Sequence, residues 1–247
     1  MTTHDRQRER LQRTIEWARR IEAHLADVRD AHLGEVHFRP SSTAISIIGL
    51  RPDRPQRGKS TITNIVGLAA NFEREYAEHC VACDHTRETP EKRLQSFLLA
   101  GACRNRRHIR DLQLDEQEAP LLFVTDELSL PVENGEIVCD ILALHGDLPA
   151  AIELKPARQM KRLVEQVTDY AALVDEHADL FGELYSVILG RRVELHAPCE
   201  RWIVWPHPVR NARHPREAEL AALGVRVVGY AEIEEGFEFK IGRAVDG

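Results

Sequence analysis

Two consecutive apolar segments joined by a short turn constrain the fold of this chain more than any other feature. Segments 137–144 and 150–154 have the composition of buried strands, and the turn between them contains Gly146 and Pro149. A helix is expected next, over 157–178, because its apolar residues recur at three- and four-residue steps. A buried strand pair followed by an amphipathic helix predicts an α/β fold, with a mixed central sheet flanked by helices.

The remaining elements divide the chain into an expected N-terminal extension and a main domain. A helix start is expected at Thr89, which is a good N-cap and is followed by Pro90. A polar stretch, 84–89, precedes it and suggests a boundary, so we predict an α+β extension over 1–84 and a main domain over 85–247. Further helices are expected over 5–30, over 60–79 and from 89 to about 102, and further strands over 35–38, 43–50, 121–125, 201–205, 225–230 and 237–241.

Composition excludes several classes of protein. Hydrophobic residues make up 43% of the 247 residues, enough for a proper core. The formal net charge is −7, so binding of nucleic acid through overall positive charge is not expected, although local basic patches could still serve. The N-terminal residues are charged and no apolar run approaches the ~20 residues of a membrane span, so no secretory leader and no membrane partner are expected. The five cysteines lack a disulfide-scaffold spacing and fit the cytoplasm.

Three charged residues interrupt the two apolar strands. Asp140 lies inside 137–144, while Glu153 and Lys155 lie at the end of the next strand and, two residues apart, face the same side. A buried carboxylate is costly unless something pairs with it. Two carboxylates on one face form a hard oxygen site for Mg²⁺ or Mn²⁺, and an ammonium can orient water or stabilise developing charge. Lysine is also scarce, since only five of the 33 basic residues are lysines.

The pattern Asp140-x12-Glu153-x-Lys155 on adjacent strands, followed by a helix, resembles the PD-(D/E)XK nuclease superfamily. The resemblance covers roughly residues 89 to 205, in the order helix, strands, motif hairpin, helix, strand, and Cys139 occupies the place of the usual proline. It implies a restriction-endonuclease-like fold in which Asp140 and Glu153 hold Mg²⁺ or Mn²⁺ and Lys155 assists catalysis.

Two further features agree with this resemblance. Gln166 and Tyr170 resemble the Gln-x3-Tyr motif of the RecB-like branch, and residues four apart share a helix face, so both are expected to line the groove as part of the catalytic set. Many members of the superfamily carry an extra acidic metal ligand on the helix before the sheet, and Glu91 has that place here.

Each of these residues also has an ordinary structural interpretation. The Asp140, Glu153 and Lys155 trio could be a salt bridge of an edge strand, where charges are common. Gln166 and Tyr170 could be an exposed amide beside a core-edge aromatic. Glu91 could simply stabilise the helix dipole, and Glu127 is a rival third acid.

Basic and cysteine-containing segments suggest further contacts. The basic segment with Arg104, Arg106, Arg107 and Arg110 is our candidate for holding nucleic-acid phosphates. A zinc site is considered at Cys80 and Cys83, with His79 or His85 nearby, although no second Cys-x2-Cys pair exists. The sequence from Gly58 to Thr61 lacks the upstream glycine of a phosphate-binding loop, so ATP binding is rejected.

The sequence therefore predicts a Mg²⁺- or Mn²⁺-dependent nuclease that hydrolyses phosphodiester bonds of nucleic acid, with DNA as the expected partner. A restriction, repair or defence role follows only from the resemblance. The alternatives are a catalytically inactive nucleic-acid-binding or assembly module of the same fold, and a zinc-stabilised interaction protein. The near-heptad spacing of the helix over 5–30 also suggests a homodimer.

Overall fold

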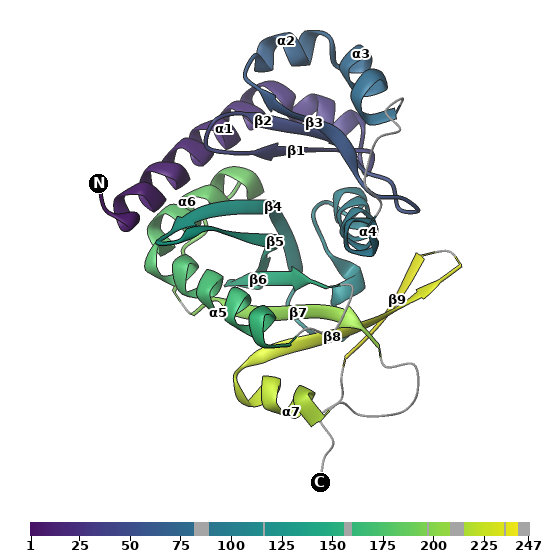
Figure 1. Cartoon of the computed structure of the whole chain (residues 1–247). Helices are drawn as coiled ribbons and strands as arrows, with labels where there is room; N and C mark the ends of the chain where they lie inside the picture. The colour runs from purple at the N-terminus through teal and green to yellow at the C-terminus, as the bar shows by residue number, and fades with distance from the viewer. Residues whose placement is uncertain are drawn as a thin grey trace.

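The fold is mixed α/β, as expected, and contains a six-stranded mixed sheet (Figure 1). The computed structural model describes residues 1–81, 89–115, 117–155, 160–196, 198–207, 215–234 and 236–241. Within these residues the strand order of the large sheet is β4-β5-β6-β7-β8-β9. The strands are β4 (Leu121–Val132), β5 (Gly135–His145), β6 (Leu148–Leu154), β7 (Glu200–Pro206), β8 (Val225–Ile233) and β9 (Gly236–Ile241).

The direction of pairing changes in the middle of the sheet. Strands β4, β5 and β6 are antiparallel neighbours, β6, β7 and β8 run parallel, and β9 returns antiparallel to β8. Parallel neighbours need a crossover connection, and the helices after β6 and β7 supply it. The expected mixed central sheet flanked by helices is confirmed, and the apolar pair predicted over 137–144 and 150–154 is the β5–β6 hairpin.

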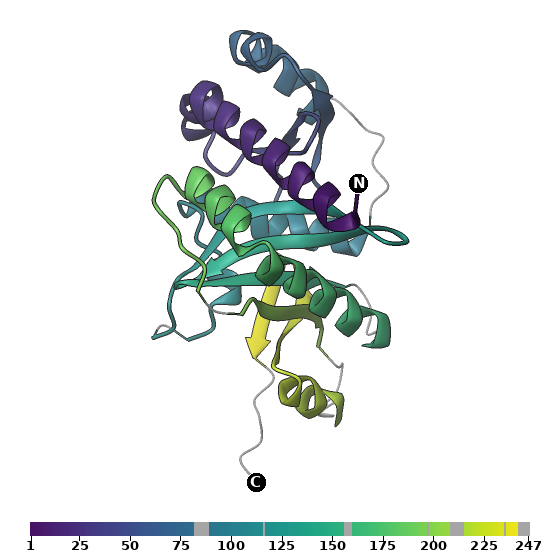
Figure 2. The same ribbon diagram turned by 90° about the vertical axis from the view of Figure 1, so that its left-hand side faces the viewer.

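Helices cover both faces of this sheet. On one face α4 (Pro90–Arg104) packs Leu94 and Leu98 against Ile141, Ile152 and other strand residues. The opposite face is covered by α1 (Thr3–Ala31), α5 (Met160–Glu176) and α6 (Ala178–Leu189). Figures 1 and 2 show α1 lying beside α6 and β4, while α7 (Pro215–Ala222) lies against β8. The sheet is therefore the middle layer, with a hydrophobic core on each side.

Helix α4 begins where the sequence predicts. The Thr89 hydroxyl accepts a hydrogen bond from the Lys92 amide at 3.3 Å, and Pro90 occupies the first helical turn, where its missing N–H leaves no partner unsatisfied. This cap fixes the position of Glu91 in the first turn of α4.

The helix expected over 60–79 is wrong in its first part. Residues up to Ile62 form a strand, β3 (Arg57–Ile62), in a three-stranded antiparallel sheet with β1 (Val36–Pro40) and β2 (Ile45–Gly49). The β-branched Thr61, Ile62 and Thr63 favour a strand, and Asn64 then caps a new helix by accepting from the Gly67 amide at 2.9 Å. The helical part that follows is α2 (Ile65–Ala70), α3 (Phe72–Tyr76) and a π-helix (Ala77–Val81).

The apolar stripe of α1 is buried inside the chain. Leu11 and Ile15 join the core under the large sheet, whereas Ile21 and Leu25 join the core under β1 to β3. This intrachain packing accounts for the spacing that suggested a homodimer, so α1 offers that dimer no support. Helix α1 thus packs against both sheets. The domain boundary predicted at 84/85 lies outside the described residues.

Among the described residues, no helix combines the length and the apolar character needed to cross a lipid bilayer.

Candidate active site

The three charged residues singled out in the sequence lie where β5 and β6 separate. The ladder between these strands runs from His145 and Leu148 to its last pair, Ile141 and Ile152. The next position of β5 is Asp140, whose Oδ2 accepts a hydrogen bond from the Leu154 amide at 2.8 Å. A carboxylate therefore takes the place of a strand carbonyl, and the two strands part at the candidate site.

Lys155 lies close to both carboxylates. Its Nζ is 3.5 Å from Asp140 Oδ2 and 3.2 Å from Glu153 Oε2. The Lys155 amide donates to the Val204 carbonyl at 2.9 Å, which holds the end of β6 against β7. The structure thus brings together Asp140, Glu153 and Lys155, although Asp140 lies 13 positions before Glu153 in the sequence.

Glu153 is the most unusual member of the trio. It is fully buried, and within the part of the chain that the structure describes neither carboxylate oxygen accepts a hydrogen bond. Burial, followed by repulsion from Asp140, raises the pKa of Glu153 from 4.5 to about 9. Since buried polar atoms normally have hydrogen-bond partners, a buried carboxylate that is paired with the Lys155 ammonium alone among the described basic residues is a ready ligand for a cation.

Glu91 lies within electrostatic reach of the same site. Burial and the charge of Asp140 raise the pKa of Glu91, which is half-buried. Burial alone would lower the pKa of Lys155, but Asp140, Glu153 and Glu91 outweigh burial and raise it. Asp140, Glu153 and Glu91 therefore all act electrostatically on Lys155, and their oxygens are of the kind that a divalent cation prefers.

The rival third acid, Glu127, has other partners. It pairs with Arg39 at 2.5 Å and with Lys92, so its charge is balanced by these two cations. It lies in β4 with a positive φ of 47°, an uncommon conformation for a residue other than glycine. Of the two acids, Glu91 is the one whose charge acts on both Asp140 and Lys155.

Gln166 and Tyr170 attach α5 to the sheet. Gln166 Nε2 donates to the Val138 carbonyl at 3.0 Å, two residues before Asp140. The Tyr170 hydroxyl donates to the Leu128 carbonyl at 3.0 Å, and Tyr170 is fully buried in the core. The expectation that both line a groove therefore fails for Tyr170, because a side chain with no exposed surface cannot touch a substrate. Both are positioning residues in this structure.

Tyr170→Phe should distinguish a positioning role of the Tyr170 hydroxyl from a direct catalytic role. The variant loses one buried hydrogen bond and leaves the Leu128 carbonyl poorer by one donor, so we expect the free energy of unfolding to fall by about 1–2 kcal/mol. Any catalytic activity of the folded protein should stay within a few-fold of the wild type. Urea denaturation beside an activity assay measures both, and a large loss of activity at unchanged stability would restore a direct role for the hydroxyl.

The predicted basic patch lies away from the trio. Arg104, Arg106 and Arg110 are exposed, but Arg107 is mostly buried, and its guanidinium donates to the Val124 carbonyl at 3.4 Å. Glu91 lies at the opposite end of α4 from Arg104, a helix of 15 residues and therefore about 22 Å long. The patch does not join the candidate site, and a contact with phosphates there remains a prediction.

A second ionic network, which the sequence analysis missed, lies beside the site. Asp126 is fully buried, with its Oδ1 3.0 Å from His37 Nε2 and 2.7 Å from Arg39 Nε. Burial alone would raise the pKa of Asp126, but Arg39 and His37 outweigh burial and hold it well below its usual value. Gln95 donates to Asp126 at 3.3 Å and to the Asp140 carbonyl at 3.2 Å. The N-terminal sheet is thus connected to the strand that carries Asp140.

The other sequence candidates lie outside this arrangement. Cys80 is buried in the core of the N-terminal sheet, and burial raises the pKa of its thiol to about 11, which disfavours the thiolate that binds zinc. Its expected partners Cys83 and His85 lie outside the described residues. Gly58 to Thr61 lie within the strand β3 itself rather than in a loop that leads into a helix, so the rejection of a phosphate-binding loop agrees with the structure.

A second Glu-x-Lys pair shows that this spacing also occurs at an ordinary surface ion pair. Glu238 and Lys240 in β9 form an ion pair at 3.2 Å with side chains 52% and 59% exposed, whereas Glu153 is fully buried. Burial rather than spacing thus distinguishes the candidate site.

A scan against models of protein families and a search of curated proteins found no match to this chain.

Proposed function

We propose that this chain is a metal-dependent nuclease of the PD-(D/E)XK type, with its active site at the divergence of β5 and β6. One observation carries the proposal: Glu153 is fully buried, accepts no hydrogen bond from the described residues, and lies beside Lys155, on which Asp140 and Glu91 also act. An edge-strand salt bridge, the ordinary alternative, would leave its carboxylate exposed to water. Here β6 is paired on both sides, by β5 and by β7.

The chemistry of these side chains fits a hard divalent cation. Asp140 and Glu153 would hold Mg²⁺ or Mn²⁺, with Glu91 as a third oxygen donor, since these ions prefer carboxylates. The unsatisfied oxygens of Glu153 are the observation that supports this fit. When bound, the metal would polarise the scissile phosphate and lower the pKa of an attacking water.

Lys155 would act beside the carboxylates. Its ammonium is held within 3.5 Å of Asp140 and 3.2 Å of Glu153, and its raised pKa keeps it charged at neutral pH. From there it can donate a hydrogen bond to the attacking water or to a phosphate oxygen as negative charge develops. Gln166 and Tyr170 keep α5 against β5 and β4 and thereby hold Asp140 in place.

The finer description of the fold is part of the proposal. The order α4, β4, β5, β6, α5, α6, β7 follows the order helix, strands, motif hairpin, helix, strand on which the superfamily resemblance rests, with α6 as an additional helix before β7. A restriction-endonuclease-like fold follows from it as a proposal. DNA as the substrate, and a restriction, repair or defence role, also come from that resemblance.

A cleavage assay tests the proposal. The protein is incubated with supercoiled plasmid, single-stranded DNA and RNA, each with Mg²⁺, Mn²⁺ or EDTA, beside Asp140→Asn. Glu238→Gln is the matched control, because Glu238 has the same Glu-x-Lys spacing on an exposed strand. We expect metal-dependent cleavage of DNA by the wild type and Glu238→Gln and none by Asp140→Asn.

Two results would overturn the proposal. Cleavage by Asp140→Asn at the wild-type rate would show that the site lies elsewhere. Binding of DNA without cleavage in any metal would favour the catalytically inactive module of the same fold.

A further inference from the structure

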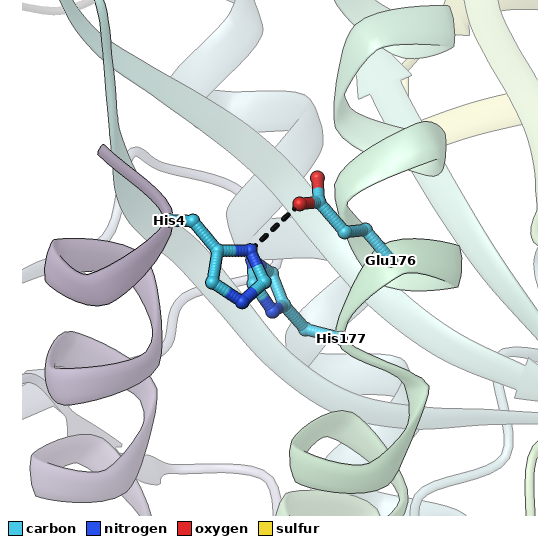
Figure 3. Close-up of side chains that lie close together, drawn as sticks. All are labelled: His4, Glu176 and His177. Carbon is cyan, nitrogen blue, oxygen red and sulfur yellow. Dashed lines mark hydrogen bonds and ion pairs between the residues drawn. The ribbon is translucent and has the colours of Figure 1, made fainter. Parts of the chain in front are cut away.

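The first turn of α1 meets the corner between α5 and α6 in a cluster of metal-binding side chains (Figure 3). His4 lies in the first turn of α1, Glu176 is the last residue of α5, and His177 separates α5 from α6. His4 Nδ1 is 2.8 Å from Glu176 Oε1. One ligand atom from each of the three residues lies within 4.8 Å of the others.

We propose that His4, Glu176 and His177 form a Zn²⁺ site that fastens α1 to the α5–α6 corner. Two imidazoles and one carboxylate, with water as a fourth ligand, are a donor set that zinc accepts in proteins. Nitrogen ligands also distinguish this site from the all-oxygen site proposed at Asp140, because Mg²⁺ prefers oxygen.

The hydrogen bonds of Gln7 leave one nitrogen of His177 ready to bind a metal. The Pro131 carbonyl can only accept, so Gln7 Nε2 donates to it at 2.9 Å. The remaining amide oxygen of Gln7 then faces His177 Nε2 at 3.1 Å and accepts its proton. In the neutral ring the lone pair is therefore on Nδ1.

That nitrogen is an orphan in the structure. His177 is fully buried, and no described residue makes a hydrogen bond to its Nδ1. A protonated Nδ1 would be a buried donor without an acceptor, which is unfavourable, while a lone pair directed at a metal would be satisfied. A fixed second shell that sets the tautomer, as Gln7 does here, is typical of metal-binding histidines.

The other two side chains have the freedom to complete the site. His4 and Glu176 are each 49% exposed, and their rings and carboxylates can turn toward His177. Zinc holds nitrogen and oxygen ligands at roughly 2.0–2.2 Å, so the ligand atoms must approach more closely than the 4.8 Å limit found here. His4 and Glu176, which are half exposed, would turn to reach the metal, whereas Gln7 holds the His177 ring.

The proposed zinc site lies where α1 meets the α5–α6 corner, and another ion pair already connects these elements. Arg8 pairs with Asp179 at 2.7 Å, one turn along α1 and just inside α6. Gln166, next to the candidate active site, precedes Glu176 by ten residues of α5, about 15 Å along the helix. Zinc here would therefore stabilise the position of α1 and would not take part in the proposed cleavage reaction.

Zinc titration of EDTA-treated, dialysed protein tests the inference. The full-length chain, His4→Ala and Glu176→Gln are each titrated with Zn²⁺ by calorimetry, and bound metal is counted by elemental analysis. His196→Ala is the matched control, because His196 also pairs with a glutamate, Glu194, at 3.2 Å but is exposed and has no third ligand among the described residues. Both test residues are half exposed, so the variants are expected to fold.

We expect the wild type and His196→Ala to bind one zinc ion more per chain than His4→Ala. Glu176→Gln should bind that ion on the order of 10- to 100-fold more weakly. Zinc should also raise the melting temperature of the wild type but not of His4→Ala, since an ion that binds only the folded state stabilises it. Equal zinc content and affinity in all four proteins would overturn the site and would leave the nuclease proposal untouched.

Discussion

Lys155→Ala lowers the rate of metal-dependent DNA cleavage by on the order of 10²- to 10³-fold in our expectation. The reason is the place of the ammonium, 3.2 Å from Glu153 and 3.5 Å from Asp140, where it can stabilise charge that develops only in the transition state. Both carboxylates remain in the variant, so binding of Mn²⁺ should persist. The loss should then appear in kcat rather than in the metal concentration needed for half-maximal activity.

The measurement is single-turnover cleavage of a labelled DNA across a range of Mn²⁺ concentrations. Lys240→Ala is the control, because Lys240 forms the same kind of ion pair at the same spacing on the exposed strand β9. An equal rate for Lys155→Ala and Lys240→Ala would remove Lys155 from the mechanism. A rate restored in Lys155→Ala by excess Mn²⁺ would show that the side chain serves metal binding instead.

The central hairpin could be predicted because its local signals agree. Apolar runs, a turn with Gly146 and an amphipathic helix all indicate β5, β6 and α5, and the structure confirms the strand pair and the helix. The helix was expected to end near 178, and the separate helix α6 (Ala178–Leu189) was not predicted. His177 breaks the two helices without a proline or glycine, so no local residue signals the break.

The third strand of the N-terminal sheet was harder to predict, because it depends on tertiary contacts. Strand β3 has mainly exposed residues, with Ile62 as its buried one, and its polar composition gives no alternation to read. It forms because β2 offers a ladder of hydrogen bonds, and Gly58 permits the close approach to Ile47. Such pairing depends on a partner strand rather than on the segment itself.

The charged residues of the candidate site also divide into those that the sequence reveals and those that only the fold brings together. Asp140, Glu153 and Lys155 could be found because charges stand out within apolar strands. Asp126 also interrupts an apolar strand, yet its partners His37 and Arg39 lie 89 and 87 positions away, and nothing in the sequence connects them. His4 and Glu176 are 172 positions apart in the chain, so their proximity could be seen only in the folded structure.

Glu153→Gln should make the metal-free protein more stable at neutral and alkaline pH while abolishing cleavage. The pKa of Glu153 is about 9 in the folded protein and near its ordinary 4.5 when unfolded. Between these values the folded state holds a proton that the unfolded state does not, so the wild type loses stability as the pH rises. Gln cannot titrate, and at pH 7 the variant should gain on the order of 2 kcal/mol.

Thermal unfolding of metal-free protein from pH 5 to 9 measures this gain. The difference between Glu153→Gln and the wild type should be smallest near pH 5 and should grow toward pH 9, whereas Glu238→Gln, at an exposed pair, should show no such trend. Mn²⁺ should raise the melting temperature of the wild type more than that of Glu153→Gln, because a cation favours the ionised carboxylate. A gain that did not change with pH would mean that Glu153 is already ionised in the folded protein. A functional carboxylate held in a core at the expense of stability is the arrangement expected of a metal ligand, because a residue selected only for stability would be neutral there.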